Sequence, residues 1–423
     1  MLNKTYFLLI ILFLCFNLSA QKKRDSIKIG DLKPYTYHFD VVDGEIIGDA
    51  KAFFEKEVAL HQYVLLGEYH GSYRISEFTN ALIPMLAAED FNTFALEVGP
   101  ISGKILSEFT EEAQSTTKQL HDFNSQYYVD EEGDYYGAIP FFEHKGDAQF
   151  LTQAAQYNWN LLGLDQEFIY GYEPLIDRMY QNISTANQAK HSAFYKEVKD
   201  SLMAYYELEK SGEQDLAVLM HNSPLVKQYL STFSPLHPEN RAIADAIVAT
   251  TQIYYYNATR RYLDCNSTRI EYMKKNLRAG FERINFDLAK DKMLLKMGGI
   301  HTARGFSWLS LYEIGNTLNE LANFHGNTSL HLSFQSRFYE EDGKMVDALE
   351  DPKSYGSRYK DFLQVAKSDQ WTIIDLRPLK SKYFYSRKYL TSDLIKDVFE
   401  QHDVIIIPKK DIEPSLNFTL RTP

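Results

Sequence analysis

The chain has 423 residues, of which 44 % are apolar and 14 % are aromatic, so it can bury a large core and does not have the composition of a disordered chain. Its formal net charge is −12 at pH 7, and no stripe of Lys and Arg interrupts this acidic character. Binding to nucleic acid depends on neutralising phosphates. We therefore expect a folded protein that does not bind nucleic acid.

The first twenty residues have the pattern of a secretory signal peptide. Lys4 supplies the positive start, residues 7–16 are apolar, and a plausible cleavage site precedes Gln21. The apolar stretch is too short to span a bilayer comfortably. We interpret it as a cleaved export signal, with a retained membrane anchor as the alternative. Lipidation of Cys15 is disfavoured because Leu14 stands where a small residue is needed.

After cleavage, the sequence predicts an exported protein, periplasmic or secreted, with no stable membrane span. No other segment is apolar enough to cross a membrane, and the one remaining cysteine, Cys265, excludes an internal disulfide. The stability of the mature chain must therefore come from its core.

In the first half of the chain, predicted strands alternate with predicted helices. The strands are short apolar runs, and the helices repeat apolar residues at helical spacing. In chain order the expected elements are a strand at Tyr63–Gly67, a helix at Tyr73–Ala88, a strand at Thr93–Val98, a helix at Ile101–Phe109 and a strand at Trp159–Asp165. This alternation predicts a mostly parallel sheet covered by helices.

The pattern then changes to one long helical tract, from about Tyr172 to Glu282, before strands return. The later predicted strands are Lys292–Met297, Ser329–Phe334, Trp371–Leu376 and Val404–Ile407. We predict a single α/β domain over residues 21–423, with a mostly parallel sheet flanked by helices and a long all-helical insertion at about 172–282.

Ionisable residues follow four of these strands. Glu68 and His70 follow the first, Glu97 the second, Asp165 and Glu167 the third, and His301 and Arg304 follow the strand that ends in two glycines. Ligands of open α/β sheets bind beyond the carboxyl ends of the strands. If the strand geometry persists, Glu68 and His70 point to one side and Tyr69 points away. We expect Glu68, His70, Glu97 and His301 to converge in one cleft.

Each of these residues also has an ordinary structural interpretation. Glu97 or Glu167 could begin the following helix as an N-terminal acid, and Arg304 could pair with a carboxylate. His70 and His301 stand out among the histidines because each has glycines beside it and follows a strand.

Several common catalytic motifs are absent from the sequence. It contains no G-x-S-x-G elbow, no H-E-x-x-H motif, no Walker loop and no G-x-G-x-x-G, and Cys265 has no histidine nearby. The remaining interpretations are a His/Glu site that activates water, or one that holds a metal or a haem.

Three short motifs, in this order, resemble a known superfamily. "LLGEYHG", then "ALEVG", then "GGIHTARG" is similar to the superfamily that contains the erythromycin esterases, the ChaN-like haem-binding uptake proteins and the Tiki/TraB proteins. The resemblance places the G-E-x-H signature on Gly67, Glu68 and His70, the second acid on Glu97 and the late histidine on His301. Erythromycin esterases usually have two residues between the Glu and the His, whereas here only Tyr69 intervenes, as in ChaN-like proteins.

The resemblance and the residues leave two classes of function open. The first is an exported hydrolase that cleaves an ester- or amide-like bond of a small-molecule substrate, with His70 as general base, Glu68 or Glu97 fixing its tautomer, and His301 and Arg304 stabilising negative charge.

The second class is a haem- or metal-binding uptake protein of the cell envelope. In it His70, Tyr69 or His301 would ligate iron, with Asp165 at the same cofactor site. A metal-dependent hydrolase of Tiki type lies between the two, with Glu68, His70 and His301 as ligands of a divalent metal.

Overall fold

The computed structural model describes residues 26–131, 134–341, 343–351, 353–384 and 393–420. The predicted signal segment lies outside these residues. Among the helices that are described, none is both long and apolar enough to cross a bilayer.

Within this part of the chain, the main sheet has nine strands in the order β2-β1-β12-β13-β9-β3-β8-β4-β7. The strands from β13 to β7 run parallel, whereas β12, β1 and β2 extend the sheet by antiparallel pairing. Their bounds are β1 Thr36–Val42, β2 Glu45–Gly48, β3 Tyr63–Glu68, β4 Phe91–Leu96, β7 Asn160–Gly163, β8 Lys292–Gly298, β9 Ser329–Phe334, β12 Trp371–Asp375 and β13 Val404–Ile407. The α/β class with a mainly parallel sheet is confirmed.

Alternate residues of the central strands enter opposite layers of the core. Val64 and Leu66 of β3 belong to a cluster with helices α3, α4 and α7, whereas Tyr63 and Leu65 pack with α13 and α14. Because both faces are covered, β3 is a nearly continuous apolar run rather than an alternation of apolar and polar residues. The helices are α2 Ile29–Leu32, α3 Lys51–Leu60, α4 Tyr73–Ala87, α5 Pro100–Phe109, α6 Thr116–Tyr127, α7 Lys145–Gln156, α14 Ile314–Phe324, α15 Lys360–Leu363, α16 Arg377–Phe384 and α17 Asp393–Gln401.

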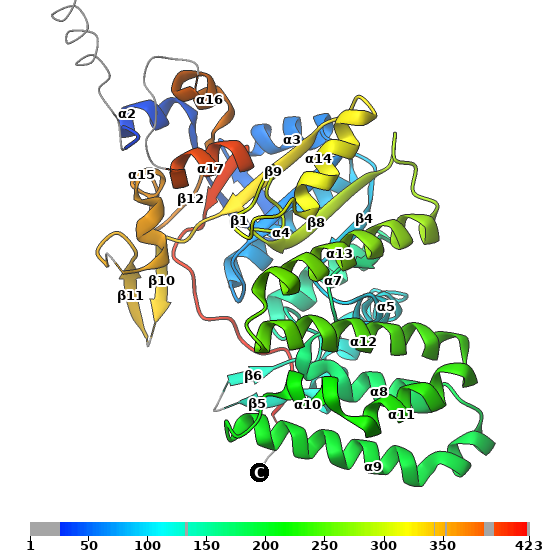
Figure 1. Ribbon diagram of the computed structural model, residues 1–423. Coiled ribbons are helices and arrows are strands. Elements are labelled where there is room, and N and C mark those ends of the chain that lie inside the picture. Colours follow the sequence, from blue (N-terminus) through cyan, green and yellow to red (C-terminus); the bar gives the residue numbers. More distant parts are fainter. Residues whose placement is uncertain (1–25, 132–133, 342, 352, 385–392, 421–423) are drawn as a thin grey trace, which may run out of the picture.

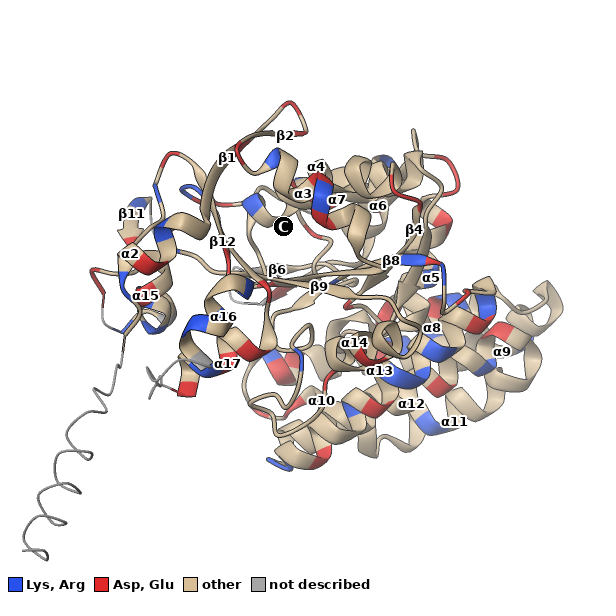
Figure 2. Ribbon diagram, turned by 90° about the horizontal axis from the view of Figure 1, so that it is seen from above, with Lys and Arg blue, Asp and Glu red and all other residues tan. Residues whose placement is uncertain are grey.

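Between β7 and β8 the described chain forms helices without strands. They are α8 Tyr172–Gln181, α9 Thr185–Lys210, α10 Leu216–Asn222, α11 Pro224–Phe233, α12 Pro238–Ala258 and α13 Tyr262–Ile284. Figure 1 shows α13 next to the sheet and the other helices stacked beyond it. In Figure 2, acidic and basic positions are interspersed along this helical region. Whether the tract unfolds together with the sheet stays a prediction.

The C-terminal segment links the sheet to the elements around α7. After β13 it runs past the small hairpins β10–β11 (Phe338–Glu341 and Lys344–Asp347) and β5–β6 (Val129–Glu131 and Asp134–Tyr136), as Figure 1 shows. Backbone hydrogen bonds join Lys145 N to Ser415 O at 2.9 Å and Asn417 N to Glu143 O at 2.8 Å. This segment therefore forms one wall of the space beyond the strand ends.

Candidate functional site

The predicted site residues lie beyond the carboxyl ends of four neighbouring strands. Glu68 ends β3, Glu97 follows β4, Asp165 follows β7 and His301 follows β8. These four strands are consecutive and parallel in the sheet, so their carboxyl ends meet at one edge.

Glu68 holds His70 on one side and a buried lysine on the other. Its Oε1 atom is 3.3 Å from His70 Nδ1, and its Oε2 atom is 2.5 Å from Lys296 Nζ. Burial raises the pKa of Glu68, but Lys296 and His70 lower it more, to about 2. The Glu68 side chain is therefore a carboxylate with one cation and one imidazole as partners.

His70 is oriented from several directions. Its Nε2 atom lies 3.8 Å from Glu97 Oε2, and its ring stacks on Phe141 with the centroids 3.9 Å apart. Phe141 has a φ of 65°, which is uncommon for a residue with a side chain. Residues with such backbone angles cluster at functional sites. Burial lowers the pKa of His70, but hydrogen bonding and charge from Glu68 raise it above its ordinary value.

Glu97 joins the two histidines. Its Oε1 atom lies 3.5 Å from His301 Nε2 and 3.0 Å from Arg269 Nη2, and its Oε2 atom accepts a hydrogen bond from Gly298 N. Burial raises the pKa of Glu97, but His301, Arg269 and His70 lower it more. Arg269 comes from α13, so the helical tract contributes directly to this site.

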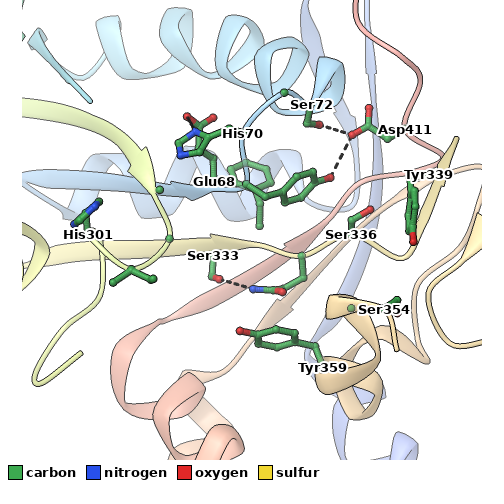
Figure 3. A pocket seen from close by; sticks show the side chains of 18 of the residues that line it. Glu68, His70, Ser72, His301, Ser333, Ser336, Tyr339, Ser354, Tyr359 and Asp411 are labelled. Atoms are coloured by element: carbon green, nitrogen blue, oxygen red, sulfur yellow. Dashed lines mark hydrogen bonds and ion pairs between the residues drawn. The ribbon is translucent and has the colours of Figure 1, made fainter. Parts of the chain in front are cut away.

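His301 is fixed by a second carboxylate. Its Nδ1 atom lies 2.9 Å from Glu313 Oε2, and Ser307 donates a hydrogen bond to the other oxygen of Glu313 at 2.8 Å. Thus Glu68, His70, Glu97 and His301 form one connected cluster, and Figure 3 shows His301 across from Glu68 and His70.

The two acids after β7 have structural partners. Asp165 accepts hydrogen bonds from Arg269, which holds that guanidinium beside Glu97. Glu167 accepts from Ile101 N at 2.7 Å and from the Ser102 hydroxyl at 2.6 Å, so it caps the first turn of α5. Burial raises the pKa of Glu167 to about 7. Neither Asp165 nor Glu167 lines the cavity described below.

The structure places Arg304 away from the cluster. Its guanidinium forms a bidentate pair with Asp403, donates to Asn319 and Ser329, and does not line the cavity. Tyr69 does line the cavity, but its hydroxyl donates to Asp411 Oδ2 at 3.3 Å. The pairing with Asp403 is the structural role that the sequence left open for Arg304.

A cavity of about 880 Å³ extends from the cluster. One end holds the histidines and carboxylates together with Arg269. The other end carries polar and aromatic side chains, among them Ser333, Ser336, Tyr339, Ser354 and Tyr359, as Figure 3 shows. Such a volume suits a small-molecule ligand.

The donor set does not fit a metal ion or a haem iron. The two carboxylates of the cluster are already paired with cations, Glu68 with Lys296 and Glu97 with Arg269. Nδ1 of His70 and both ring nitrogens of His301 lie within 3.5 Å of carboxylate oxygens. Among the described residues, no group of three His, Cys, Asp or Glu side chains has the arrangement of a metal site. An additional cation would have to displace Lys296 or Arg269.

Sequence reasoning missed four residues of the cluster: Lys296, Arg269, Glu313 and Phe141. A charged residue inside an otherwise apolar strand has to be paired, so Lys296 in "MLLKMGG" carried a usable signal. Arg269 and Glu313 stand in ordinary helical contexts, and nothing in the sequence marks the stacking of Phe141 on His70.

Three solved structures are similar to this chain in fold. A succinoglycan biosynthesis protein aligns with a TM-score of 0.56 at 17 % identity, covering 92 % of this chain and 97 % of that one. A mutant of the erythromycin esterase EreC, in its open conformation, aligns with a TM-score of 0.53 at 15 % identity, covering 87 % and 96 %. A Bacillus cereus protein aligns with a TM-score of 0.52 at 16 % identity, covering 89 % and 96 %.

The similarity spans most of each chain. No family model matches the sequence, and no curated protein matches it closely. At these identities the comparison shows that the chain has the α/β fold of these proteins.

Proposed function

We propose that the chain is a hydrolase related to the erythromycin esterases, which cleaves an ester- or amide-like bond of a small molecule by direct attack of water. The observation that carries this proposal is the placement of His70, with one ring nitrogen beside the Glu68 carboxylate and the other at the end of a large cavity. The shared fold with an erythromycin esterase supports the proposed relationship.

In the proposed mechanism each group has a role that its position supports. In the neutral ring, Nδ1–H donates to Glu68, which leaves Nε2 as the acceptor that takes a proton from the attacking water. The same ring then returns the proton to the leaving group. Arg269 and His301 line the same end of the cavity, and in this proposal they stabilise the negative charge that develops on the substrate while they stay beside Glu97.

Replacement of His70 tests this assignment. On a panel of model esters, His70→Ala should lower kcat by about 10²- to 10⁴-fold, the usual contribution of a positioned general base. The matched control is His325→Ala, because His325 is exposed at the end of α14 and does not line the cavity. Wild-type kcat/KM in the His70 variant would contradict the mechanism.

Chelation separates this mechanism from a metal-dependent one. Because Lys296 and Arg269 already neutralise the two carboxylates, activity should survive treatment with a chelator. Loss of activity that a divalent metal restores would contradict the assignment and favour a metal hydrolase. The cellular location remains part of the proposal: the N-terminal sequence supports export through a cleaved signal peptide.

A further inference from the structure

Three aromatic side chains are exposed on one short loop between β8 and α14. The loop comprises Gly305–Tyr312, and the exposed fractions of Phe306, Trp308 and Tyr312 are 58 %, 47 % and 57 %. Single exposed apolar residues are normal on a folded protein, but a group of them marks a surface that binds a ligand, a partner or a membrane. This aromatic loop is therefore a candidate binding surface.

The backbone of the aromatic loop is held in place by Ser307, which is buried between two of the exposed rings. Ser307 N donates a hydrogen bond to Leu311 O at 2.8 Å, and the Ser307 hydroxyl accepts one from Leu309 N at 3.2 Å. The rings of Phe306 and Tyr312 pack edge to face, with their centroids 5.4 Å apart. A surface that is already ordered loses less entropy when a ligand binds to it.

The same serine connects the aromatic loop to the histidine cluster. Its hydroxyl donates to one oxygen of Glu313, and the other oxygen lies 2.9 Å from His301 Nδ1. Trp308, the residue after this serine, lines the large cavity together with His301 and Arg269. The exposed aromatic surface is thus continuous with the wall of the cavity that holds the histidines.

We propose that the aromatic loop recognises the substrate through a bulky apolar group, alkyl or aromatic, that packs on Trp308 and Phe306 while the scissile bond lies beside His70. This inference rests on the proposed function and adds the class of substrate: an ester or amide with an apolar group in its acyl or its alcohol or amine half. Such a group binds because it leaves water and packs against aromatic rings. The continuity with the cavity assigns the loop to the substrate rather than to a membrane or a second copy of the chain.

Two series of esters test this recognition. In one series the acyl group grows from acetyl to cyclohexanecarbonyl with the alcohol constant, and in the other the alcohol grows from methanol to cyclohexanol with the acid constant. In the wild type, kcat/KM should rise with the size of the apolar group in one series or in both. In that series Trp308→Ala should lower the ratio of kcat/KM for the largest ester to that for the smallest by about tenfold, and Trp308→Phe should keep most of the ratio.

The matched control is Phe324→Ala. Phe324 is 84 % exposed at the end of α14 and does not line the cavity, so its removal should leave the ratio as in the wild type. A wild type without any size preference, or a wild-type ratio in Trp308→Ala, would overturn the proposal.

Iodide quenching of tryptophan fluorescence tests the same contact without any activity. Of the three tryptophans in the sequence, Trp159 and Trp371 are buried, so iodide reports on Trp308. Dicyclohexyl ketone has apolar groups on both sides of its carbonyl and cannot be hydrolysed. It should shield Trp308 from iodide, and Phe306→Ala should raise the concentration for half-maximal shielding by about threefold to tenfold. No shielding at the solubility limit of the ketone would overturn the proposal.

The two experiments separate this inference from the proposed function. Shielding in a protein that hydrolyses none of the esters would refute the proposed function and leave the apolar contact standing. Ester hydrolysis without any dependence on Trp308 would refute the contact and leave the proposed function standing. Dimerisation, or binding to phosphatidylcholine vesicles, that Trp308→Ala abolishes would give the loop another occupant and overturn the inference.

Discussion

Lys296 is the residue whose replacement tests the physical basis of the site most directly. Its ammonium lies 2.5 Å from Glu68 Oε2, and the two side chains are only 5 % and 6 % exposed. The same ammonium lies 5.2 Å from the centre of the Phe150 ring. Replacing it with methionine keeps the approximate volume but leaves the Glu68 carboxylate buried without its cation.

Two independent arguments give the size of the effect. Breaking a buried ion pair by removing one partner costs about 3–5 kcal/mol, because an uncompensated charge remains. The pKa of Glu68, lowered from its ordinary 4.5 to about 2, corresponds to about 3 kcal/mol in favour of the carboxylate, a value that includes the part contributed by His70. We therefore expect Lys296→Met to lower the free energy of unfolding at pH 7 by about 3 kcal/mol.

The pH dependence follows from the direction of the pKa change. A carboxyl group with a depressed pKa stabilises the folded state above its unfolded pKa, and this stabilisation is lost as the pH falls from about 4.5 toward 2. Between pH 7 and pH 3 the wild type should lose about 2 kcal/mol that the Glu68→Gln variant does not lose.

Urea unfolding of Lys296→Met, Glu68→Gln and the double variant forms a double-mutant cycle. The double variant should be less destabilised than the sum of the single variants. Lys118→Met is the control, because the Lys118–Asp122 pair is exposed and such pairs contribute about 0–1 kcal/mol. A cost for Lys296→Met no larger than that of this control would refute the reasoning.

Three further predictions concern neighbouring features. In Glu68→Gln the acid side of the pH profile of kcat/KM should move to lower pH, because the carboxylate that raises the pKa of His70 is gone. An acid side that stays where it is in the wild type would contradict the assignment of His70 as the base. Gly99→Ala should lower the free energy of unfolding by about 1–3 kcal/mol, because the Cβ of the new alanine would lie 2.1 Å from the carboxyl carbon of Glu167, whose carboxylate is hydrogen-bonded to the start of α5. Urea unfolding measures the effect, and Gly30→Ala is the control because a Cβ there would meet nothing within 4 Å. Arg304→Ala should lower the Tm measured by calorimetry, because it leaves the buried Asp403 carboxylate without its cation. The value of kcat/KM at 25 °C should stay within twofold of wild type. A large loss of activity in the folded variant would show that Arg304 takes part in catalysis.

The sequence predicted the frame of the site because that frame depends on local patterns. Largely apolar runs identify strands that are buried on both faces, and their ends place Glu68, Glu97 and His301 at one edge of the sheet. The antiparallel edge made by β1 and β2 was not predicted. Most residues of these two strands are partly or fully exposed, and the strands lack the apolar run that marked the parallel strands.

The partners of the site residues could not be predicted because they depend on how distant segments dock. Arg269 is 172 residues from Glu97 along the chain and reaches it only because α13 packs against the sheet beside β7. Phe141 lies on a loop whose conformation is set by contacts with the C-terminal segment. Motif spacing describes neither arrangement, which is why the sequence left a metal and a haem open as alternatives.

The placement of the two cations decides what the cluster is suited to do. A metal site would leave the carboxylate and imidazole lone pairs free to converge on one ion, but here Lys296 and Arg269 already neutralise Glu68 and Glu97. Both acids consequently stay ionised, and Glu68 acts on His70 as a hydrogen-bond acceptor that fixes the tautomer. An imidazole held in this way, with its other nitrogen beside a large cavity, is equipped to take a proton from water. Fixed protein cations thus balance the charge of the carboxylates here, and the imidazole remains available for the role of base in the proposed hydrolysis.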